Sequence, residues 1–357
     1  MQHIDPEALA RLFVDGENDR EAIEQHLDAC DDCRELVAAY ARASDESSAH
    51  PFAPTVIREE LLPPSKTGPF VGRIVANRYR LERVVGEGGM GVVWAARDLA
   101  NEREVALKIV KEPSAELRKR SLREACVTAR VGHPTLIEVH DVVSLETEKG
   151  EVPVLVMPLL EGESLDRMLA RRAQLDERET IAILEPVVAG MCAAHARGVI
   201  HRDLKPPNVF LANDGPGSRV VVVLDFGLAK LLSPDGSDAG ADKLTRTGAL
   251  LGTPFYMAPE QLFGESSVDG RADVWAIGVM LYECLSGRKP IEGRSYGQIA
   301  KNVAVKAITP LDALVPGVDP RLAAIAARML EKERSLRPDL LEVHATLGML
   351  NLAREGG

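Results

Sequence analysis

The spacing of apolar residues changes once along this sequence, and the change constrains the fold more than any other feature. From Tyr79 to about residue 110, strand-like runs alternate with short polar or glycine-rich turns: YRLERVV, GVVWAA and REVALKIV. After Ser164 the helical period dominates, so we expect a small sheet-rich lobe followed by a larger helical lobe. The predicted helices are 114–130, 176–197, 269–286, 320–331 and 338–352, and two further strands are predicted at 136–143 and 152–157.

The chain of 357 residues is longer than one hydrophobic core usually supports, since cores stop growing at about 250–300 residues. Residues 1–43 look helical, because Asp5 can cap a helix that begins at Pro6. Residues 44–76 hold five prolines and no sustained period, which is typical of a linker. The predicted domains are therefore a helical module at 1–43, a linker at 44–76 and a large domain at 77–353.

The net charge of −11 disfavours attraction to nucleic acid or to anionic membranes, which basic residues provide. The N-terminus is acidic where a secretory signal would be basic, and the apolar run at 220–226 is far shorter than the roughly 18 residues of a membrane span. We therefore expect a cytoplasmic protein with no direct nucleic-acid or membrane partner. In that reducing compartment we expect few disulfides among its 5 cysteines, and paired thiols more often hold metal or do redox chemistry.

The stretch GEGGMGVV, residues 86–93, contains a G-x-G-x-x-G pattern, which alone can mark nothing more than a turn. A dinucleotide-binding loop opens a helix, whereas here the run VVWAA continues as a strand. A glycine-rich hairpin allows backbone N–H groups to approach the phosphates of a nucleotide. Lys108 ends the next strand; it could be an ordinary surface lysine, or it could contact those phosphates with Glu124 as its partner.

Two later segments, HRDLKPPN at 201–208 and LDFG at 224–227, carry the remaining polar chemistry. Taken singly, Asp203 could cap a turn, Asn208 could satisfy loop backbone and Asp225 could end a strand. Phosphoryl transfer from ATP to an alcohol requires a carboxylate for the hydroxyl, oxygen ligands for Mg²⁺ and cations around the phosphoryl group. The two segments supply all three.

These motifs, followed in order by GTPFYMAPE and DVWAIG, resemble the protein kinase superfamily and most closely the bacterial eukaryotic-like (Hanks-type) Ser/Thr kinases. The resemblance covers roughly residues 78–350 and implies an α+β bilobal kinase fold that uses ATP with Mg²⁺ or Mn²⁺ and acts on protein substrates. For the nucleotide, the resemblance implies that Gly86, Gly88 and Gly91 cover the phosphates and that Val93 and Ala106 line the adenine pocket, with Met157 behind it and the backbone of Leu159 and Leu160 at the adenine edge.

For catalysis, the resemblance implies that Lys108 pairs with Glu124, that Asp203 is the catalytic base, that Lys205 steadies the γ-phosphate, and that Asn208 and Asp225 bind Mg²⁺. It also implies that Glu260 pairs with Arg337 and that Asp273 holds the catalytic-loop backbone.

The resemblance also refines the substrate class. Lys205 together with Thr253 matches the Ser/Thr branch rather than the tyrosine branch. Pro207 stands where kinases that prefer basic substrates often carry a glutamate, so no strong preference for arginine is expected. Pro158 replaces a common glutamate between the lobes and removes a backbone N–H. A catalytically inactive scaffold would be expected to lack Lys108, Asp203, Asn208 or Asp225, and the sequence retains all four.

The segment between Asp225 and Glu260 is rich in Gly, Asp and Ser and resembles a kinase activation loop. In this family an arginine such as Arg202 often binds a phosphorylated residue of that loop. A phosphate on Thr245 or Thr247 would bring a charge of roughly −1.5 to −2 toward Arg202, so these threonines are the predicted autophosphorylation sites.

The stretch HLDACDDC near the N-terminus places His26, Cys30 and Cys33 on one helical face, which suits three ligands of a tetrahedral Zn²⁺ site. His3 is the candidate fourth ligand if the two helices form a hairpin. A redox pair is the less suitable alternative, because the acidic spacer disfavours a thiolate. Plain core cysteines are the other, although about 43 residues make a small core without a metal.

The whole segment 1–43 resembles the zinc-binding anti-sigma-factor domain, which implies a small all-α zinc-binding module ahead of the kinase domain. In that family the module binds a sigma factor, so a sigma-factor-like or other regulatory protein is the expected partner. The expected protein is thus a kinase with a sensing or docking module. The competing hypothesis is a zinc-dependent adaptor in which the kinase domain mainly scaffolds.

Overall fold

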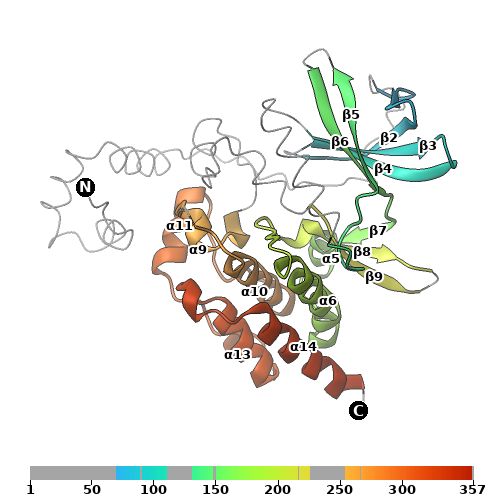
Figure 1. Ribbon diagram of the computed structural model, residues 1–357. Helices are drawn as coiled ribbons and strands as arrows, with labels where there is room; N and C mark the ends of the chain where they lie inside the picture. Colours follow the sequence, from blue (N-terminus) through green and yellow to red (C-terminus); the bar gives the residue numbers. More distant parts are fainter. Residues whose placement is uncertain are drawn as a thin grey trace, which may run out of the picture.

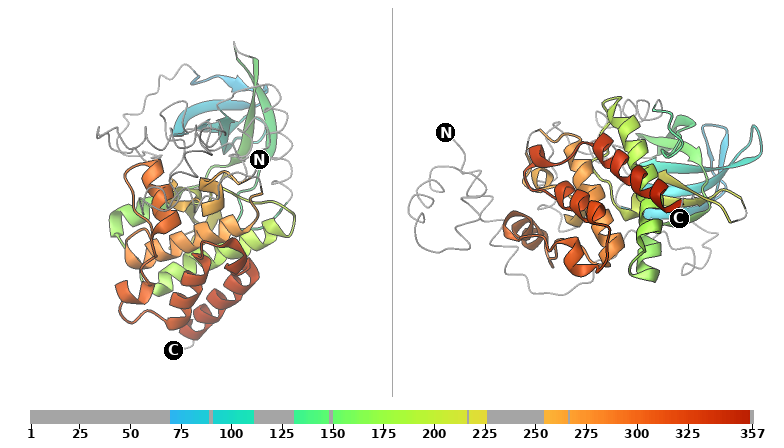
Figure 2. Two further views of the ribbon diagram at one scale, coloured as in Figure 1. Left: turned by 90° about the vertical axis from the view of Figure 1, so that its left-hand side faces the viewer. Right: turned by 90° about the horizontal axis from the view of Figure 1, so that it is seen from below.

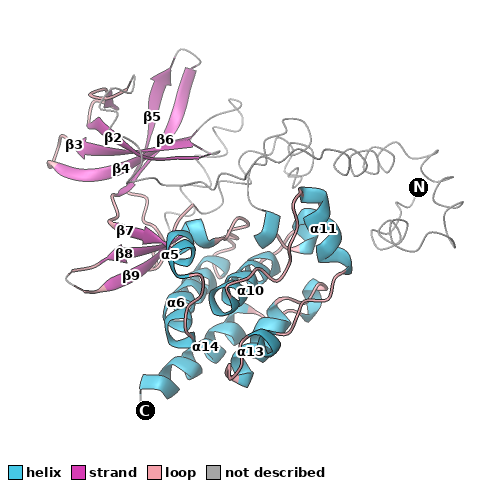
Figure 3. Cartoon of the chain, turned by 180° about the vertical axis from the view of Figure 1, so that it is seen from behind, coloured by secondary structure: helices cyan, strands magenta, loops and turns pink. Residues whose placement is uncertain are grey.

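The computed structural model describes residues 70–88, 91–110, 131–147, 150–215, 217–225, 254–265 and 267–355. These residues form the two lobes that the change of period predicts, a sheet lobe followed along the chain by a helical lobe, seen from opposite sides in Figures 1 and 3. The predicted helical module at 1–43, the linker up to residue 69 and the predicted helix at 114–130 lie outside the described residues. In the described part of the chain, no helix has the length and apolar character needed to cross a membrane.

The sheet lobe is one antiparallel sheet of six strands in the order β1-β2-β3-β4-β6-β5. One face of this sheet buries a small core that includes Leu81, Trp94, Leu107 and Val156. The three strand-like runs between residues 79 and 110 are confirmed as β2, β3 and β4. The strands are β1 Ile74–Val75, β2 Tyr79–Gly88, β3 Gly91–Asp98, β4 Arg103–Val110, β5 Asp141–Thr147 and β6 Gly150–Pro158.

The strand predicted at 136–143 was wrong at its start, since β5 begins only at Asp141. The preceding residues pair with the other lobe instead: Leu136 forms a parallel bridge with Val223, and the N–H of Ile137 donates to the Val223 carbonyl over 3.0 Å. This segment joins the two lobes by backbone hydrogen bonds.

The helical lobe is built around α10, Arg271–Ser286, in which every residue from Ala272 to Tyr282 is buried. A helix that is apolar on all sides must have neighbours on all sides, and α6 and α13 pack against it. The C-terminal helix α14, red in Figures 1 and 2, packs in turn against α6. The other helices of eight or more residues are α5 Leu165–Arg172, α6 Glu177–His195, α11 Tyr296–Val305, α13 Pro320–Met329 and α14 Leu340–Glu355.

A small second sheet lies on the helical lobe next to the first sheet (Figure 1). It consists of β7 Gly162–Ser164, β8 Val209–Asn213 and β9 Arg219–Val223, paired antiparallel with Val209 opposite Val223. The spacing of apolar residues in the sequence did not predict these three short strands. They matter because the polar motifs around Asn208 and Asp225 lie at the paired ends of β8 and β9.

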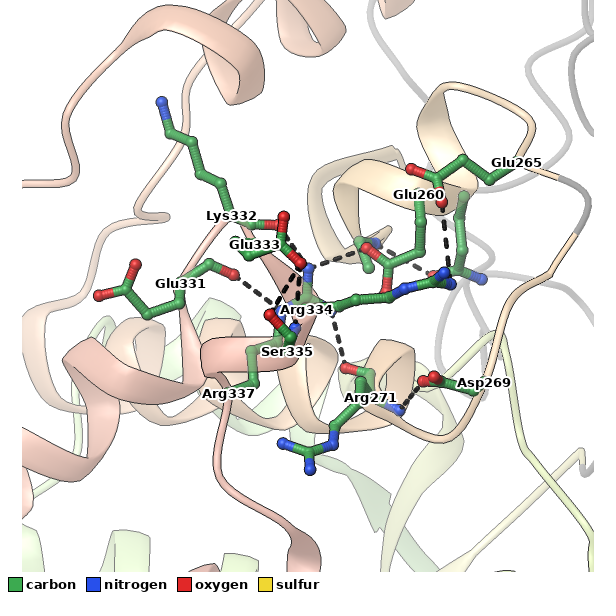
Figure 4. A network of polar contacts seen from close by, with 12 residues as sticks. Glu260, Glu265, Asp269, Arg271, Glu331, Lys332, Glu333, Arg334, Ser335 and Arg337 are labelled. Atoms are coloured by element: carbon green, nitrogen blue, oxygen red, sulfur yellow. Dashed lines mark hydrogen bonds and ion pairs between the residues drawn. The ribbon is translucent and has the colours of Figure 1, made fainter.

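A buried ion pair closes one side of the helical lobe, as the sequence predicted (Figure 4). Both guanidinium nitrogens of Arg337 donate to the two carboxylate oxygens of Glu260, over 2.7 and 2.8 Å, and neither side chain is more than 2% exposed. The guanidinium also lies 5.1 Å from the ring centroid of Trp275. With three backbone carbonyls added, all five N–H donors of the guanidinium have acceptors; these carbonyls belong to Arg271, Glu331 and Lys332.

The substitution Glu260→Gln should lower the free energy of unfolding by about 3–5 kcal/mol, because it leaves the Arg337 charge buried without a counter-charge. Urea unfolding followed by circular dichroism measures this loss. The matched control is Glu342→Gln, which disrupts an ion pair with Arg328 that is nearly half exposed and should cost less than about 1 kcal/mol. Equal effects of the two substitutions would contradict the structural role given to Glu260.

Candidate active site

The predicted catalytic residues Asp203 and Lys205 lie on the loop between α6 and β8, just before the 3-10 turn η1 Pro206–Asn208. The Lys205 ammonium donates to both oxygens of the Asp203 carboxylate, over 3.1 and 2.9 Å. Both side chains are only about 15% exposed, at 14% and 16%. The loop thus presents a carboxylate and a cation together at a partly covered site.

Asp273 on α10 holds this loop from the side of the core. Its carboxylate accepts the backbone N–H groups of His201 and Arg202, over 2.9 and 2.8 Å, and contacts Nε2 of His195 at 2.8 Å. Burial alone would raise the pKa of Asp273, but the hydrogen bond with His195 and the nearby His201 outweigh it, so the pKa is lowered. Asp273 therefore stays ionised and can accept all three bonds, which confirms its predicted role.

The carbonyl of Arg202 is held from the opposite side by Gln261 on the short helix α9, Pro259–Leu262. The Gln261 amide donates to this carbonyl over 2.7 Å and accepts the N–H of Ala258 over 3.1 Å. Arg202 has a left-handed backbone with φ of 64°, which is unfavourable for a residue with a side chain. Sequence reasoning missed Gln261, because no spacing signal relates it to a loop 59 residues earlier.

The two predicted metal ligands lie beside this loop. The Asn208 side-chain amide donates to the Asp203 carbonyl over 2.8 Å, which leaves its oxygen as the atom for a cation. Asp225 follows β9 in a left-handed conformation with φ of 61°, and the Asn208 carbonyl accepts the N–H of the preceding Leu224. Burial would raise the pKa of Asp225, but the charge of Lys108 and its hydrogen bond outweigh this, so the pKa is lowered.

Lys108 reaches this place from the sheet lobe. Its ammonium lies 2.5 Å from an Asp225 oxygen, and the lysine side chain is 6% exposed. The predicted partner Glu124 lies outside the described residues, so the partner that the structure places on Lys108 is Asp225. A buried ammonium at the junction of two lobes, here paired among the described residues with Asp225, is suited to binding a polyanion.

The strand register explains how the predicted nucleotide residues gather on one face. Lys108 lies opposite Val93 on β3 and opposite Leu155 on β6, while Ala106 lies opposite Met157. Directly paired residues share a face of a sheet, so these side chains line the face away from the core. In the hairpin that follows Gly86, Gly88 pairs with Gly91, and residues 89–90 lie outside the described part.

Beyond β6 the chain passes to β7 through Leu159 and Leu160, the residues predicted at the adenine edge. Leu160 packs beside Phe210 on the second sheet, and Pro158 still pairs with Val105 as the last residue of β6. A proline at the end of a strand costs little stability, because the hydrogen-bonded pairing of strands does not continue beyond it. Pro158 therefore leaves the connection between the lobes intact.

The other predicted sites lie outside the described residues. These are the zinc ligands His3, His26, Cys30 and Cys33 and the phosphorylation sites Thr245 and Thr247, together with Thr253. Among the described residues, no group of three or more His, Cys, Asp or Glu side chains is arranged to hold a metal ion.

Residues 79–346 match the family model described as the protein kinase domain. Serine/threonine-protein kinase pkn2 of Myxococcus xanthus is 35% identical over 270 residues, which cover 74% of this chain and 31% of that protein. Serine/threonine-protein kinase pkn3 of the same organism is 36% identical over 277 residues, 76% of this chain and 49% of its own length. Serine/threonine-protein kinase PknB of Mycolicibacterium smegmatis is 34% identical over 283 residues, 76% of this chain and 43% of its own length.

The chain therefore spans about a third to a half of the length of these relatives. The matched region covers well over half of the chain and extends from β2 into α14. It contains the catalytic loop, Lys108 and Asp225, whose side chains the structure brings together. On the family match and on this arrangement, the chain belongs to the protein kinase family.

Proposed function

We propose that the chain transfers the γ-phosphoryl group of ATP to serine or threonine hydroxyls of protein substrates. The observation that carries this proposal is the Asp203–Lys205 pair, held next to the Asn208 and Asp225 oxygens and to the Lys108 ammonium. A carboxylate for the hydroxyl, oxygen ligands for a hard cation and two ammonium groups are the parts that phosphoryl transfer requires. The names of the serine/threonine relatives favour hydroxyls of these two residues over tyrosine.

Each residue of the active site has a separate role in phosphoryl transfer, given by its position. Asp203 orients the substrate hydroxyl and accepts its proton as the new O–P bond forms and the bond to the leaving β-phosphate oxygen breaks. Lys205, on the same carboxylate, places its charge where the phosphoryl group moves. Lys108 and the glycine hairpin bind the phosphates. Asn208 and Asp225 would hold Mg²⁺, which neutralises phosphate charge when bound.

The substitution Asp203→Asn should lower kcat by about a hundred- to ten-thousandfold, because the amide cannot accept the hydroxyl proton. Transfer of labelled phosphate from ATP to a generic protein substrate measures the loss. The exposed Asp312, far along the chain on α12 Leu311–Leu314, gives the control Asp312→Asn, which should behave as wild type. Equal labelling by wild type and Asp203→Asn would remove the catalytic proposal.

We also propose that the kinase phosphorylates its own activation loop at Thr245 or Thr247. The support is the resemblance of this segment to a kinase activation loop, together with Arg202, a cation whose backbone is fixed at both ends and which could bind such a phosphate. Peptide mapping of the wild-type labelling reaction tests this idea. Label on either threonine supports it, and label found only elsewhere contradicts it.

Gln261 should position the catalytic loop without touching substrate. In Gln261→Ala the Arg202 carbonyl loses the side-chain N–H that donates to it, so kcat should fall about ten- to hundredfold while the KM for ATP stays unchanged. Steady-state kinetics separates the two constants. The exposed Gln174 supplies the control Gln174→Ala. A change in the KM for ATP alone would contradict the positioning role.

For the N-terminal segment we propose a zinc site formed by His26, Cys30 and Cys33 with His3, in a module that docks a sigma-factor-like or other regulatory protein. The support is the spacing of the ligands on one helical face and the small size of the segment.

The purified full chain should contain about one zinc ion, and Cys30→Ser should release it, because three ligands hold zinc less firmly than four. Elemental analysis by mass spectrometry counts the metal. Cys192→Ser, a half-buried cysteine on α6, is the control and should retain zinc. Full zinc content in Cys30→Ser would overturn the assignment.

A further inference from the structure

A second polar cluster lies in the helical lobe outside the catalytic residues; we call it the Lys289 cluster, made of Asp166, Phe255, Tyr256, Glu283 and Lys289. The Lys289 ammonium lies 2.6 Å from one oxygen of Glu283, and the Tyr256 hydroxyl donates to the other over 2.5 Å. The same ammonium lies 5.5 and 5.7 Å from the ring centroids of Phe255 and Tyr256. Glu283 is 13% exposed and Lys289 31%, so the lysine closes the outer side of a mostly buried carboxylate.

The cluster holds two carboxylates for one ammonium. Burial raises the pKa of Asp166, the neighbouring Glu283 raises it further, and Lys289 and Arg167 counteract this. Burial and Glu283 also raise the pKa of Tyr256, so this hydroxyl remains a neutral donor. Without Lys289, the same space would be an acidic pocket lined by aromatic rings, which is the environment that binds a basic side chain.

The cluster adjoins the catalytic loop. Tyr256 lines a small cavity together with Asp203, Leu204 and Met257, and its hydroxyl donates to Glu283. Helix α5, which carries Asp166 in its first turn, packs against the turn η1 that directly follows Lys205. An extended protein segment advances about 3.3–3.6 Å per residue, so a side chain a few residues from a hydroxyl at Asp203 can reach the Tyr256 side of the cluster.

We propose that Lys289 occupies, from within the chain, a subsite for a side chain of the protein substrate and excludes basic residues from it. This inference rests on the proposed kinase function. A substrate arginine or lysine at this subsite would need the Glu283 carboxylate, which Lys289 already occupies. The two positive charges would then repel each other at close range, which rejects the basic ligand. Neutral side chains meet no such penalty. Position 207 carries a proline in place of an acidic residue, and the sequence therefore predicts little preference for arginine. This feature also disfavours basic substrate residues.

The test uses the full chain and a set of peptides that differ only in having arginine or alanine at one position, scanned along both sides of the target serine. The readout is the arginine-to-alanine ratio of kcat/KM at each position. Wild type should give a ratio near one or below at every position. Lys289→Met should raise the ratio about tenfold or more at one position, because a charged hydrogen bond to a freed carboxylate contributes about that much.

Four further variants make the outcome decisive. Lys289→Arg should keep the wild-type ratios, and the exposed lysine of α11 provides the matched control Lys301→Met. Lys289→Met combined with Glu283→Gln should lose the gain. If Lys289→Met does not fold by circular dichroism, Lys289→Gln, which keeps a donor for Glu283, replaces it. Unchanged ratios in the folded variant would overturn the inference, whereas failure of wild type to phosphorylate any peptide would count against the proposed function itself.

Discussion

The catalytic loop of this kinase depends on one buried carboxylate, that of Asp273. It accepts two consecutive backbone N–H groups of the loop and a third bond from His195. Because α10 is buried on all sides, its packing fixes the position of Asp273. The hydrogen bonds from Asp273 then anchor the loop to the core of the helical lobe. The Glu260–Arg337 pair fixes the neighbouring α9 to the same core, so Gln261 approaches the loop from a second rigid support. The site is therefore precise because the helices behind it are well packed.

The two lobes meet at the active site through contacts of different kinds. The segment before β5 pairs by backbone hydrogen bonds with β9, which leads into Asp225. Lys108, on β4 of the sheet lobe, forms an ion pair with the same Asp225, which lies 117 residues further along the chain. A nucleotide bound at this junction would contact groups from both lobes, so its binding and the relative position of the lobes are coupled. The Lys289 cluster lies wholly in the helical lobe, which separates the choice of protein substrate from the binding of nucleotide.

Much of this arrangement was predictable from the sequence, and most of the missed features involve contacts between residues distant in sequence. Long periodic segments gave β2, β3, β4, α6, α10, α13 and α14, and contiguous motifs gave Asp203, Lys205, Asn208 and Asp225. The strands β8 and β9 form a local hairpin and were missed because each has only 5 residues, too few to show a clear period. The short strand β7 and the true start of β5 were missed because their pairing partners are distant in sequence. The contacts of Gln261 and His195 were missed for the same reason, since they join residues 59 and 78 positions apart. Local pattern identifies the reactive groups, whereas tertiary packing decides what holds them.

The left-handed backbone of Arg202 has a consequence for how the protein fails. A non-glycine residue in this conformation costs about 1–2 kcal/mol relative to its relaxed state, and here the clamp of Asp273 on one side and Gln261 on the other maintains it. If either contact is lost, this strain favours relaxation of the loop, so the proposed phosphoryl transfer should be lost before the rest of the lobe unfolds. In a kinase held in this way, loss of the proposed activity would therefore precede global unfolding, and activity would report on the packing of α9 and α10 more sensitively than the content of secondary structure does.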